Sequence, residues 1–260
     1  MTTASPPQPI SSAETAIAAL NGDDNQLRYY AAWWLGKNNV QDSWTVLCEA
    51  LQDEAYRTQA GGYPLRRQAA RALGELQNPQ AVPALIAALD CPDLSLREAT
   101  IQALAAIGDH RAISPLLNLL NAEAEQPYEA LIEALGTLEV WQARPQIEPF
   151  LTHPSERVQC AAARYLYLLT KEPQYIERII QNLDHPNMYL RWAAMFDLGA
   201  IGHLAAAQAI IEAKVPNSLK LLNIKRMLEA ILESDPEAES NQPDKCQFLM
   251  DTIDQLLIQL

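Results

Sequence analysis

The stretch LRRQAARALG, from Leu65 to Gly74, recurs in altered form along this chain of 260 residues. Related stretches begin at Leu27, Leu96, Pro127, Val158 and Leu190, and from the second copy onward they lie 31 or 32 residues apart. A polar break and a second apolar segment follow most copies, while apolar residues recur at intervals of three and four. Such helical hairpins cannot bury their apolar faces alone, so neighbours must stack. We predict an all-α fold, an α-solenoid (superhelix) of about six helical-hairpin repeats.

Composition divides the chain into four segments. Residues 1–12 are rich in Pro, Ser and Thr and are expected to be flexible. The repeats are predicted to fill residues 13–233, a polar linker residues 234–245, and an amphipathic helix residues 246–260. One apolar stripe is expected on that helix, formed by Phe248, Leu249, Ile253, Leu256, Leu257 and Leu260. The stripe either caps the last repeat or binds a groove of a partner, and the sequence leaves both alternatives open.

The balance of charges and cysteines excludes several classes of function. Nineteen Lys and Arg residues against 32 Asp and Glu residues give a net charge of -13, which disfavours binding to nucleic acid or anionic membrane. The four Cys residues lie far apart, with no C-x-x-C pair and no Cys/His cluster, so we expect no metal site and a reducing compartment. No targeting segment is recognisable, and no apolar run reaches the about 18 to 20 residues that span a bilayer. A cytoplasmic protein is predicted.

Aligning the repeats shows which positions share one surface. The position of Arg66 holds Arg in four of the six copies and is expected to form structural hydrogen bonds between repeats. The positions one and five residues later lie on one face of each helix. Along the repeats these pairs are Tyr29 and Trp33, Arg67 and Arg71, Glu98 and Gln102, Glu129 and Glu133, Cys160 and Arg164, and Trp192 and Phe196. Because the middle pairs are charged or polar, the aromatic end pairs are expected at the surface, as ligand contacts or as caps and interfaces. Trp34 aligns with Ala72 and is expected to be partly buried.

An insertion of seven residues lengthens the first interval, within EAYRTQAGGYPLRR, residues 54–67. It brings Tyr56, Arg57 and Tyr63 next to Arg67 and Arg71. Its two glycines permit positive φ, and the guanidinium groups of its arginines can form bidentate hydrogen bonds with carboxylates. The combination suits a flat, conjugated ligand with acidic side arms.

The stretch RYYAAWWLGK, residues 28–37, followed by this insertion resembles the E subunits of the E/F-type phycobiliprotein lyases, over roughly residues 14–233. The resemblance implies HEAT-like repeats and a heterodimer with an F-type subunit. It also implies attachment of phycocyanobilin, as bound substrate without a further cofactor, to a cysteine of apo-phycocyanin α in the cyanobacterial cytosol. Relatives of similar build attach other bilins, isomerise them or remove them. A non-catalytic adaptor or chaperone for phycobiliprotein subunits is the alternative from another class.

In this interpretation the nucleophilic thiol belongs to the acceptor protein, so the chain needs no catalytic Cys of its own. Its tasks are to orient the bilin and to stabilise its electrophilic form. The aromatic rings expected to stack on the pyrrole rings are those of Tyr29, Tyr30, Trp33 and Tyr63. The guanidinium groups expected to pair with the two propionates are those of Arg57, Arg67 and Arg71. The catalytic candidates, expected to stabilise a protonated pyrrole nitrogen, are Glu98, Glu129 and Glu133.

Overall fold

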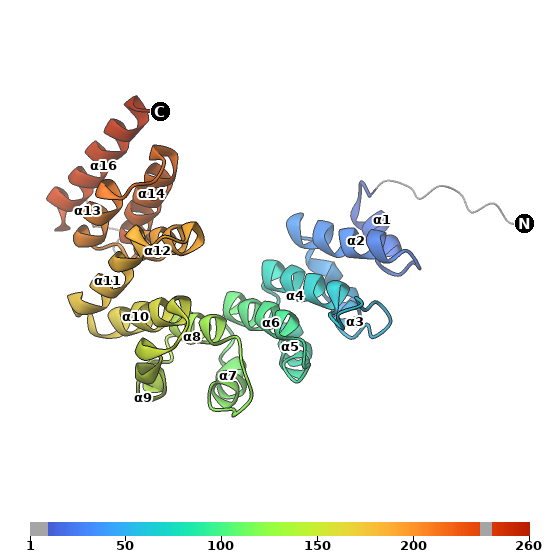
Figure 1. Ribbon diagram of the computed structural model, residues 1–260. Coiled ribbons are helices and arrows are strands. Elements are labelled where there is room, and N and C mark those ends of the chain that lie inside the picture. Colours follow the sequence, from blue (N-terminus) through green and yellow to red (C-terminus); the bar gives the residue numbers. More distant parts are fainter. Residues whose placement is uncertain (1–9, 235–240) are drawn as a thin grey trace, which may run out of the picture. The chain divides into compact units, whose positions relative to one another are not determined.

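The computed structural model describes residues 10–234 and 241–260, and within these ranges helices are joined by turns and loops, without strands (Figure 1). The chain divides between Ala143 and Arg144 into two compact units. The prediction of an all-α fold built from stacked helical hairpins is confirmed.

In the first unit, long helices pack side by side in chain order. They are α2 (Asn25–Lys37), α4 (Pro64–Leu76), α6 (Leu94–Ile107) and α8 (Tyr128–Thr137). Shorter helices complete the hairpins: α1 (Ala13–Leu20), α3 (Trp44–Ala50), α5 (Val82–Ala88) and α7 (Ile113–Leu120). Of these, α3, α5 and α7 each pack on the next long helix (Figure 1). The 3₁₀ turns of this unit are η1 (Gln41–Ser43), η2 (Pro79–Ala81), η3 (His110–Ala112) and η4 (Trp141–Ala143).

The second unit continues the same pattern. Its elements are α9 (Arg144–Ile147), η5 (Glu148–Thr152), α10 (Glu156–Thr170), α11 (Pro173–Ile180), η6 (Gln181–Asp184), α12 (Met188–Ile201), α13 (Leu204–Glu212), α14 (Asn217–Ser234) and α16 (Pro243–Ile258). Helix α12 packs on α10, and α14 packs on α12 in the same manner. Helix α14 therefore extends the row of long helices beyond the six stretches that sequence alignment identifies.

The arginines at the Arg66 position form the structural hydrogen bonds predicted for them. Each Nε donates to a backbone carbonyl near the end of the preceding short helix, where carbonyls lack helical partners. These bonds run from Arg28 to Leu20, from Arg66 to Leu51 and from Arg97 to Leu89, at 3.1, 2.7 and 3.0 Å. In the second unit, Nη1 of Arg191 donates to the carbonyl of His185, at 2.7 Å.

Glycines let the long helices of the first unit approach closely. A Cβ atom at Gly36 would lie 2.8 Å from the Cα of Ala72, and a Cβ at Gly74 would lie 2.8 Å from the Cα of Ala103. Real Cβ atoms do not approach a backbone this closely, so only glycine permits the spacing. The repeated contact holds α2, α4 and α6 in one register. Trp34, in line with Ala72, is half-buried, as predicted.

The C-terminal helix α16 packs on α14 and starts at Pro243, three residues before the predicted boundary. Its buried residues are Cys246, Leu249, Thr252 and Leu256. The prediction of a single apolar stripe is wrong for Phe248, Leu257 and Leu260, which are exposed. Of the two alternatives, the buried half of the helix acts as a cap on α14. Residues 1–9 of the predicted flexible terminus and residues 235–240 of the predicted linker lie outside the described residues.

Candidate functional site

Two aromatic rings project from the surface of α2. The helix starts at an N-cap, Asp24, whose carboxylate accepts hydrogen bonds from two backbone N–H groups. Tyr30 is 46% exposed and Trp33 is 38% exposed, and their ring centroids are 5.3 Å apart with 27° between the ring planes. Tyr29 is half-buried. The expected surface position of Trp33 is confirmed, and Tyr30 joins it in a stacked pair.

Three arginines of the insertion and of α4 lack an acidic partner in the described part of the chain. Within the described residues Arg57, Arg67 and Arg71 form no ion pair, although the chain carries 32 acidic residues. The Nε of Arg67 is buried and has no hydrogen-bond partner there. By contrast, Arg28 pairs with Asp53 at 2.7 Å and Arg66 with Glu54 at 2.6 Å. The first unit thus keeps a cluster of positive charge that its own carboxylates do not neutralise.

Tyr63, expected to stack on a ligand, is packed within the insertion. The residue is only 7% exposed, and the guanidinium groups of Arg57 and Arg66 lie 4.6 and 4.7 Å from its ring centroid. Its hydroxyl donates to a carboxylate oxygen of Glu54 at 2.9 Å, and the other oxygen of Glu54 accepts from Arg66. These contacts and the low exposure leave little of the ring surface to a ligand, and the stacking role of Tyr63 stays a prediction.

The insertion around Tyr63 is a hydrogen-bonded turn. The N–H of Thr58 donates to the carbonyl of Gly62, and the N–H of Gly61 donates to the carbonyl of Thr58, both at 2.9 Å. Gly61 has φ +85°, which glycine adopts without strain. A cavity of about 110 Å³ lies beside this turn, lined by Thr58, Gly62, Tyr63, Pro64, Arg67, Asp93 and Ser95. The turn therefore forms part of the cavity that Arg67 lines.

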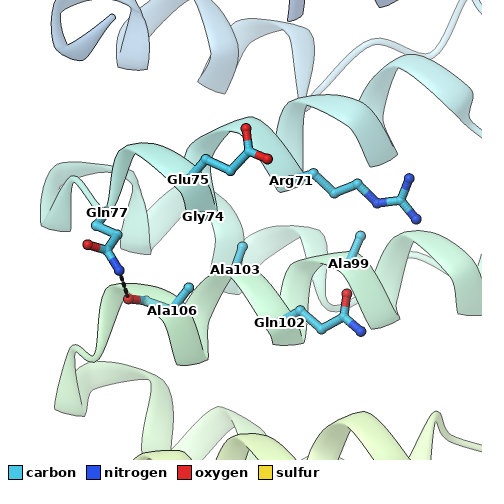
Figure 2. Close-up of a pocket in the computed structure, with 8 residues that line it drawn as sticks. All are labelled: Arg71, Gly74, Glu75, Gln77, Ala99, Gln102, Ala103 and Ala106. Carbon is cyan, nitrogen blue, oxygen red and sulfur yellow. Dashed lines mark hydrogen bonds between the residues drawn. The ribbon is translucent and has the colours of Figure 1, made fainter. Parts of the chain in front are cut away.

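A groove with a floor of small residues runs across α4, α6 and α8. Between α4 and α6 it holds about 450 Å³, lined by Arg71, Gly74, Glu75, Gln77, Ala99, Gln102, Ala103 and Ala106 (Figure 2). Between α6 and α8 it holds about 250 Å³, lined by Gln102, Ala105, Ala106, Ala130, Glu133, Ala134 and Thr137. The two parts share Gln102 and Ala106, and together we call them the alanine groove. Figure 2 shows Arg71, Gly74 and Glu75 on α4 beside Ala99, Gln102, Ala103 and Ala106 on α6, while Gln77 donates to the carbonyl of Ala106 at 2.9 Å.

The three glutamates predicted as catalytic do not gather at one place. Glu133 is half-buried and lines the alanine groove. Glu98 is exposed and accepts a long hydrogen bond of 3.5 Å from Gln102, but neither it nor Glu129 lines the groove. Sequence reasoning missed Glu75 and Gln77 at the rim. The signal in the sequence was the small size of Gly74 on α4 and of Ala103 on α6. These two residues meet in the recess between the helices.

One position of the predicted surface row is buried. The side chain of Cys160 is fully buried, and its sulfur accepts a hydrogen bond of 3.1 Å from the amide of Asn182. The prediction of a surface position is therefore wrong for this residue. Burial raises the pKa of the Cys160 thiol to about 11 and that of the Cys48 thiol to about 11. Because the thiolate is the reactive form, neither side chain is suited to act as a nucleophile at neutral pH.

Residues 10–234 and 241–260 contain no group of three His, Cys, Asp or Glu side chains placed to hold a metal ion. Among the helices described there, none combines the length and the apolar character needed to cross a bilayer.

Stacked hairpins with a polar-rimmed groove across successive long helices define an α-solenoid of HEAT-like repeats. The family model of HEAT repeats matches residues 62–136, and the model of the PBS lyase HEAT-like repeat matches residues 27–53 and 190–215. The chain belongs to the family of bilin lyase E subunits, as its relatives show. It is 70% identical to the bilin biosynthesis protein PecE of Nostoc sp., with 97% of this chain and 99% of that protein covered.

A second protein of Nostoc sp., phycocyanobilin lyase subunit alpha, is 50% identical over 92% of this chain and 93% of its own length. The solved structure of the complex of CpcE and CpcF of phycocyanin lyase from Nostoc sp. contains a chain that superposes with a TM-score of 0.82. That chain shares 45% identity, with 98% of both chains covered. The predicted family and the predicted fold class are both confirmed.

Proposed function

We propose that this chain acts with an F-type subunit as a heterodimeric bilin lyase. The pair binds phycocyanobilin and attaches it through a thioether bond to a cysteine of a phycobiliprotein α subunit. The bilin is the bound substrate, and the proposal includes no further cofactor. Because all four cysteines of the chain are free thiols, we place the reaction in the reducing cytosol of a cyanobacterium.

The observation that carries this proposal is the set of unpaired arginines on a helix that packs against the one with exposed rings. Arg67 and Arg71 lie on α4, which packs on α2, the helix that carries the Tyr30 and Trp33 pair, in a chain of net charge -13. Keeping unpaired guanidinium groups in such an acidic chain favours an anionic ligand with more than one carboxylate. A bilin has two propionates and flat pyrrole rings, so it satisfies both the charges and the aromatic surface.

The chemistry requires orientation more than a reactive group from this chain. The acceptor thiol adds across the ethylidene double bond, so that a sulfur–carbon bond forms and the thiol hydrogen ends on the bilin. No leaving group and no oxidant is involved. We assign Tyr29, Tyr30 and Trp33 to ring contacts and Arg57, Arg67 and Arg71 to the propionates. Glu133, at the groove, is our first candidate to stabilise a protonated pyrrole nitrogen, followed by Glu98 and Glu129.

Two candidates for the acceptor follow from the relatives. Phycocyanin α is the acceptor implied by the general resemblance. However, Nostoc sp. has both relatives described above, and this chain is 70% identical to one and 50% identical to the other. The higher identity to the first of these relatives favours the second candidate. In that case the chain acts as a lyase, or as a lyase and isomerase, that forms a related bilin product or modifies a related phycobiliprotein. Both candidates use the same site.

Co-expression tests the proposal directly. The chain is produced with phycocyanobilin-forming enzymes and an apo-phycobiliprotein α subunit, with and without its F-type subunit. Pigment that stays on the acceptor in a denaturing gel, seen by zinc fluorescence, measures attachment, and the absorbance of the product distinguishes simple attachment from isomerisation. No covalent pigment with any acceptor would favour the non-catalytic adaptor.

The propionate assignment has its own test. Changing Arg67→Glu together with Arg71→Glu should reduce attachment to background, while the helical content measured by circular dichroism is unchanged. The matched control is Arg111→Glu with Arg144→Glu, which makes the same change of charge at exposed arginines outside the groove. Undiminished bilin attachment by the first variant would contradict the assignment of these arginines to the propionates.

A further inference from the structure

Exposed apolar side chains are unevenly divided between the two units. In the described part of the first unit the large exposed ones are Tyr30, Trp33 and Leu94. In the second unit they are Met188, Tyr189, Trp192, Phe196, Leu204, Leu222, Phe248, Met250, Leu257, Ile258 and Leu260. The second unit therefore carries most of the apolar surface that a partner could cover.

The largest aromatic group lies on α12 and α14. Trp192 and Phe196 are each 39% exposed, Tyr189 is 73% exposed, and Leu222 of α14 is 45% exposed. The Tyr189 and Trp192 ring centroids are 6.5 Å apart in an edge-to-face arrangement, and Arg226 lies over the Phe196 ring at 5.3 Å. We call these five residues the α12–α14 patch. Within the described residues Arg226 forms no ion pair, so its charge is also available to a partner.

The register of the helices shows why this patch differs from the alanine groove. A Cβ at Gly199 would lie 2.8 Å from Oδ1 of Asn223, just as Gly74 meets Ala103 between α4 and α6. By this alignment Phe196 and Leu222 occupy the positions of Arg71 and Gln102, and Arg226 occupies that of Ala106. Large side chains thus replace both the charged rim and a small residue of the floor. The result is a surface of large, mainly apolar side chains, which suits contact with a protein.

We propose that the α12–α14 patch is the surface on which the F-type subunit docks, through an apolar helix face. This inference rests on the proposed function, which requires a heterodimer. A stable interface buries about 800 Å² on each partner, and Trp, Tyr and Arg side chains supply most of its binding energy. The patch combines these residue types. The alanine groove has a polar rim, and the buried half of α16 is already covered by α14.

The permanent partner is the occupant that fits best. Lasting interfaces are more hydrophobic than those that form and separate, and exposed aromatic patches of this kind mark protein contacts. The phycobiliprotein acceptor must leave after every turnover, so a mainly apolar surface suits it less.

The test compares the affinity for the purified F-type subunit by titration calorimetry and size-exclusion chromatography. Changing Tyr189→Ser together with Trp192→Ser should weaken binding about 30-fold or more, because both residues are of the type that dominates interface energy. Both side chains are exposed, so circular dichroism should show an unchanged fold. A second variant, Leu222→Asp, keeps the rings and places a charge in the patch, and it should weaken binding about tenfold or more.

Two controls separate this inference from the proposed function. Leu204→Ser removes an exposed leucine of α13, outside the patch, and should bind the F-type subunit like the unchanged chain. Tyr30→Ser with Trp33→Ser should also keep that affinity while losing bilin attachment. Unchanged affinity in both patch variants would overturn the docking inference alone, as would a loss confined to acceptor binding or to self-association. An unchanged chain that binds no F-type subunit would overturn the proposed heterodimer itself.

Discussion

The hydroxyl of Tyr63 donates to Glu54 at the start of the insertion, while the Tyr63 N–H donates to Asp93, the N-cap of α6, at 3.0 Å. Two guanidinium groups over the ring add cation–π contacts. The neighbouring Arg67 stays without a partner in the described structure. A rigid insertion beside an unpaired arginine lowers the cost of ordering that side chain when a ligand binds. At this scale, scaffold and ligand contact are separate roles of adjacent residues.

Changing Tyr63→Phe tests this separation. The variant removes one partly buried hydrogen bond and keeps the ring, so the free energy of unfolding measured in denaturant should fall by about 1 kcal/mol. Bilin attachment at 25 °C should continue, since no contact of the hydroxyl with the ligand is proposed. If the variant lost attachment at unchanged stability, the hydroxyl would belong to the ligand site. Tyr63→Ala, which also removes the buried ring, should cost about 3 kcal/mol or more.

The contact of α4 with α6 gives a prediction at the scale of the element. A Cβ at Gly74 would lie 2.8 Å from the Cα of Ala103, which belongs to the backbone of α6 and cannot swing aside. Gly74→Ala should therefore push the helices apart and cost about 1 to 3 kcal/mol of stability. Because the same residues line the alanine groove, bilin binding should weaken as well.

Gly108→Ala is the matched control for this change. Gly108 has φ +74° and no atom within 4 Å of a built Cβ, so its replacement should cost about 1 kcal/mol through backbone strain alone. Denaturant unfolding and bilin titration on both variants separate the effects. Bilin binding that falls equally in both variants would contradict the role of close helix packing in shaping the groove.

The elements that could be predicted from sequence are those that repeat. Equivalent positions of stacked repeats meet equivalent neighbours, so the period of about 31 residues predicted the hairpins, the arginine hydrogen bonds and the exposure of Trp33. Contacts with irregular segments could not be predicted in this way. Cys160 is covered by Asn182 of a 3₁₀ turn, and Tyr63 is covered by side chains of the insertion. No period indicates such contacts. Helix α14 lies within the segment predicted to hold the repeats, residues 13–233, but its sequence was not among the six aligned stretches.

For the whole molecule, the two units divide the surface chemistry between them. The first carries the alanine groove and the unpaired arginines, and the second carries the exposed aromatic residues of the α12–α14 patch. A groove with the unpaired Arg71 at its polar rim suits an acidic ligand, whereas exposed aromatic residues suit a protein partner. Substitutions in one unit should therefore affect bilin attachment, and substitutions in the other should affect assembly.

Helix α16 must be in place before assembly can be tested, because it covers α14, which carries part of the patch. Removing residues 246–260 should expose the apolar face of α14 and lower the melting temperature. Burial of each leucine, Leu249 and Leu256, contributes about 1.5 to 3 kcal/mol. Leu257→Ser with Ile258→Ser changes only exposed side chains and should leave the melting temperature unchanged. A truncated chain that melts at the same temperature as the full chain would contradict the capping role. If the truncated chain instead melts at a lower temperature and aggregates, any loss of its binding to the F-type subunit reflects damage to α14.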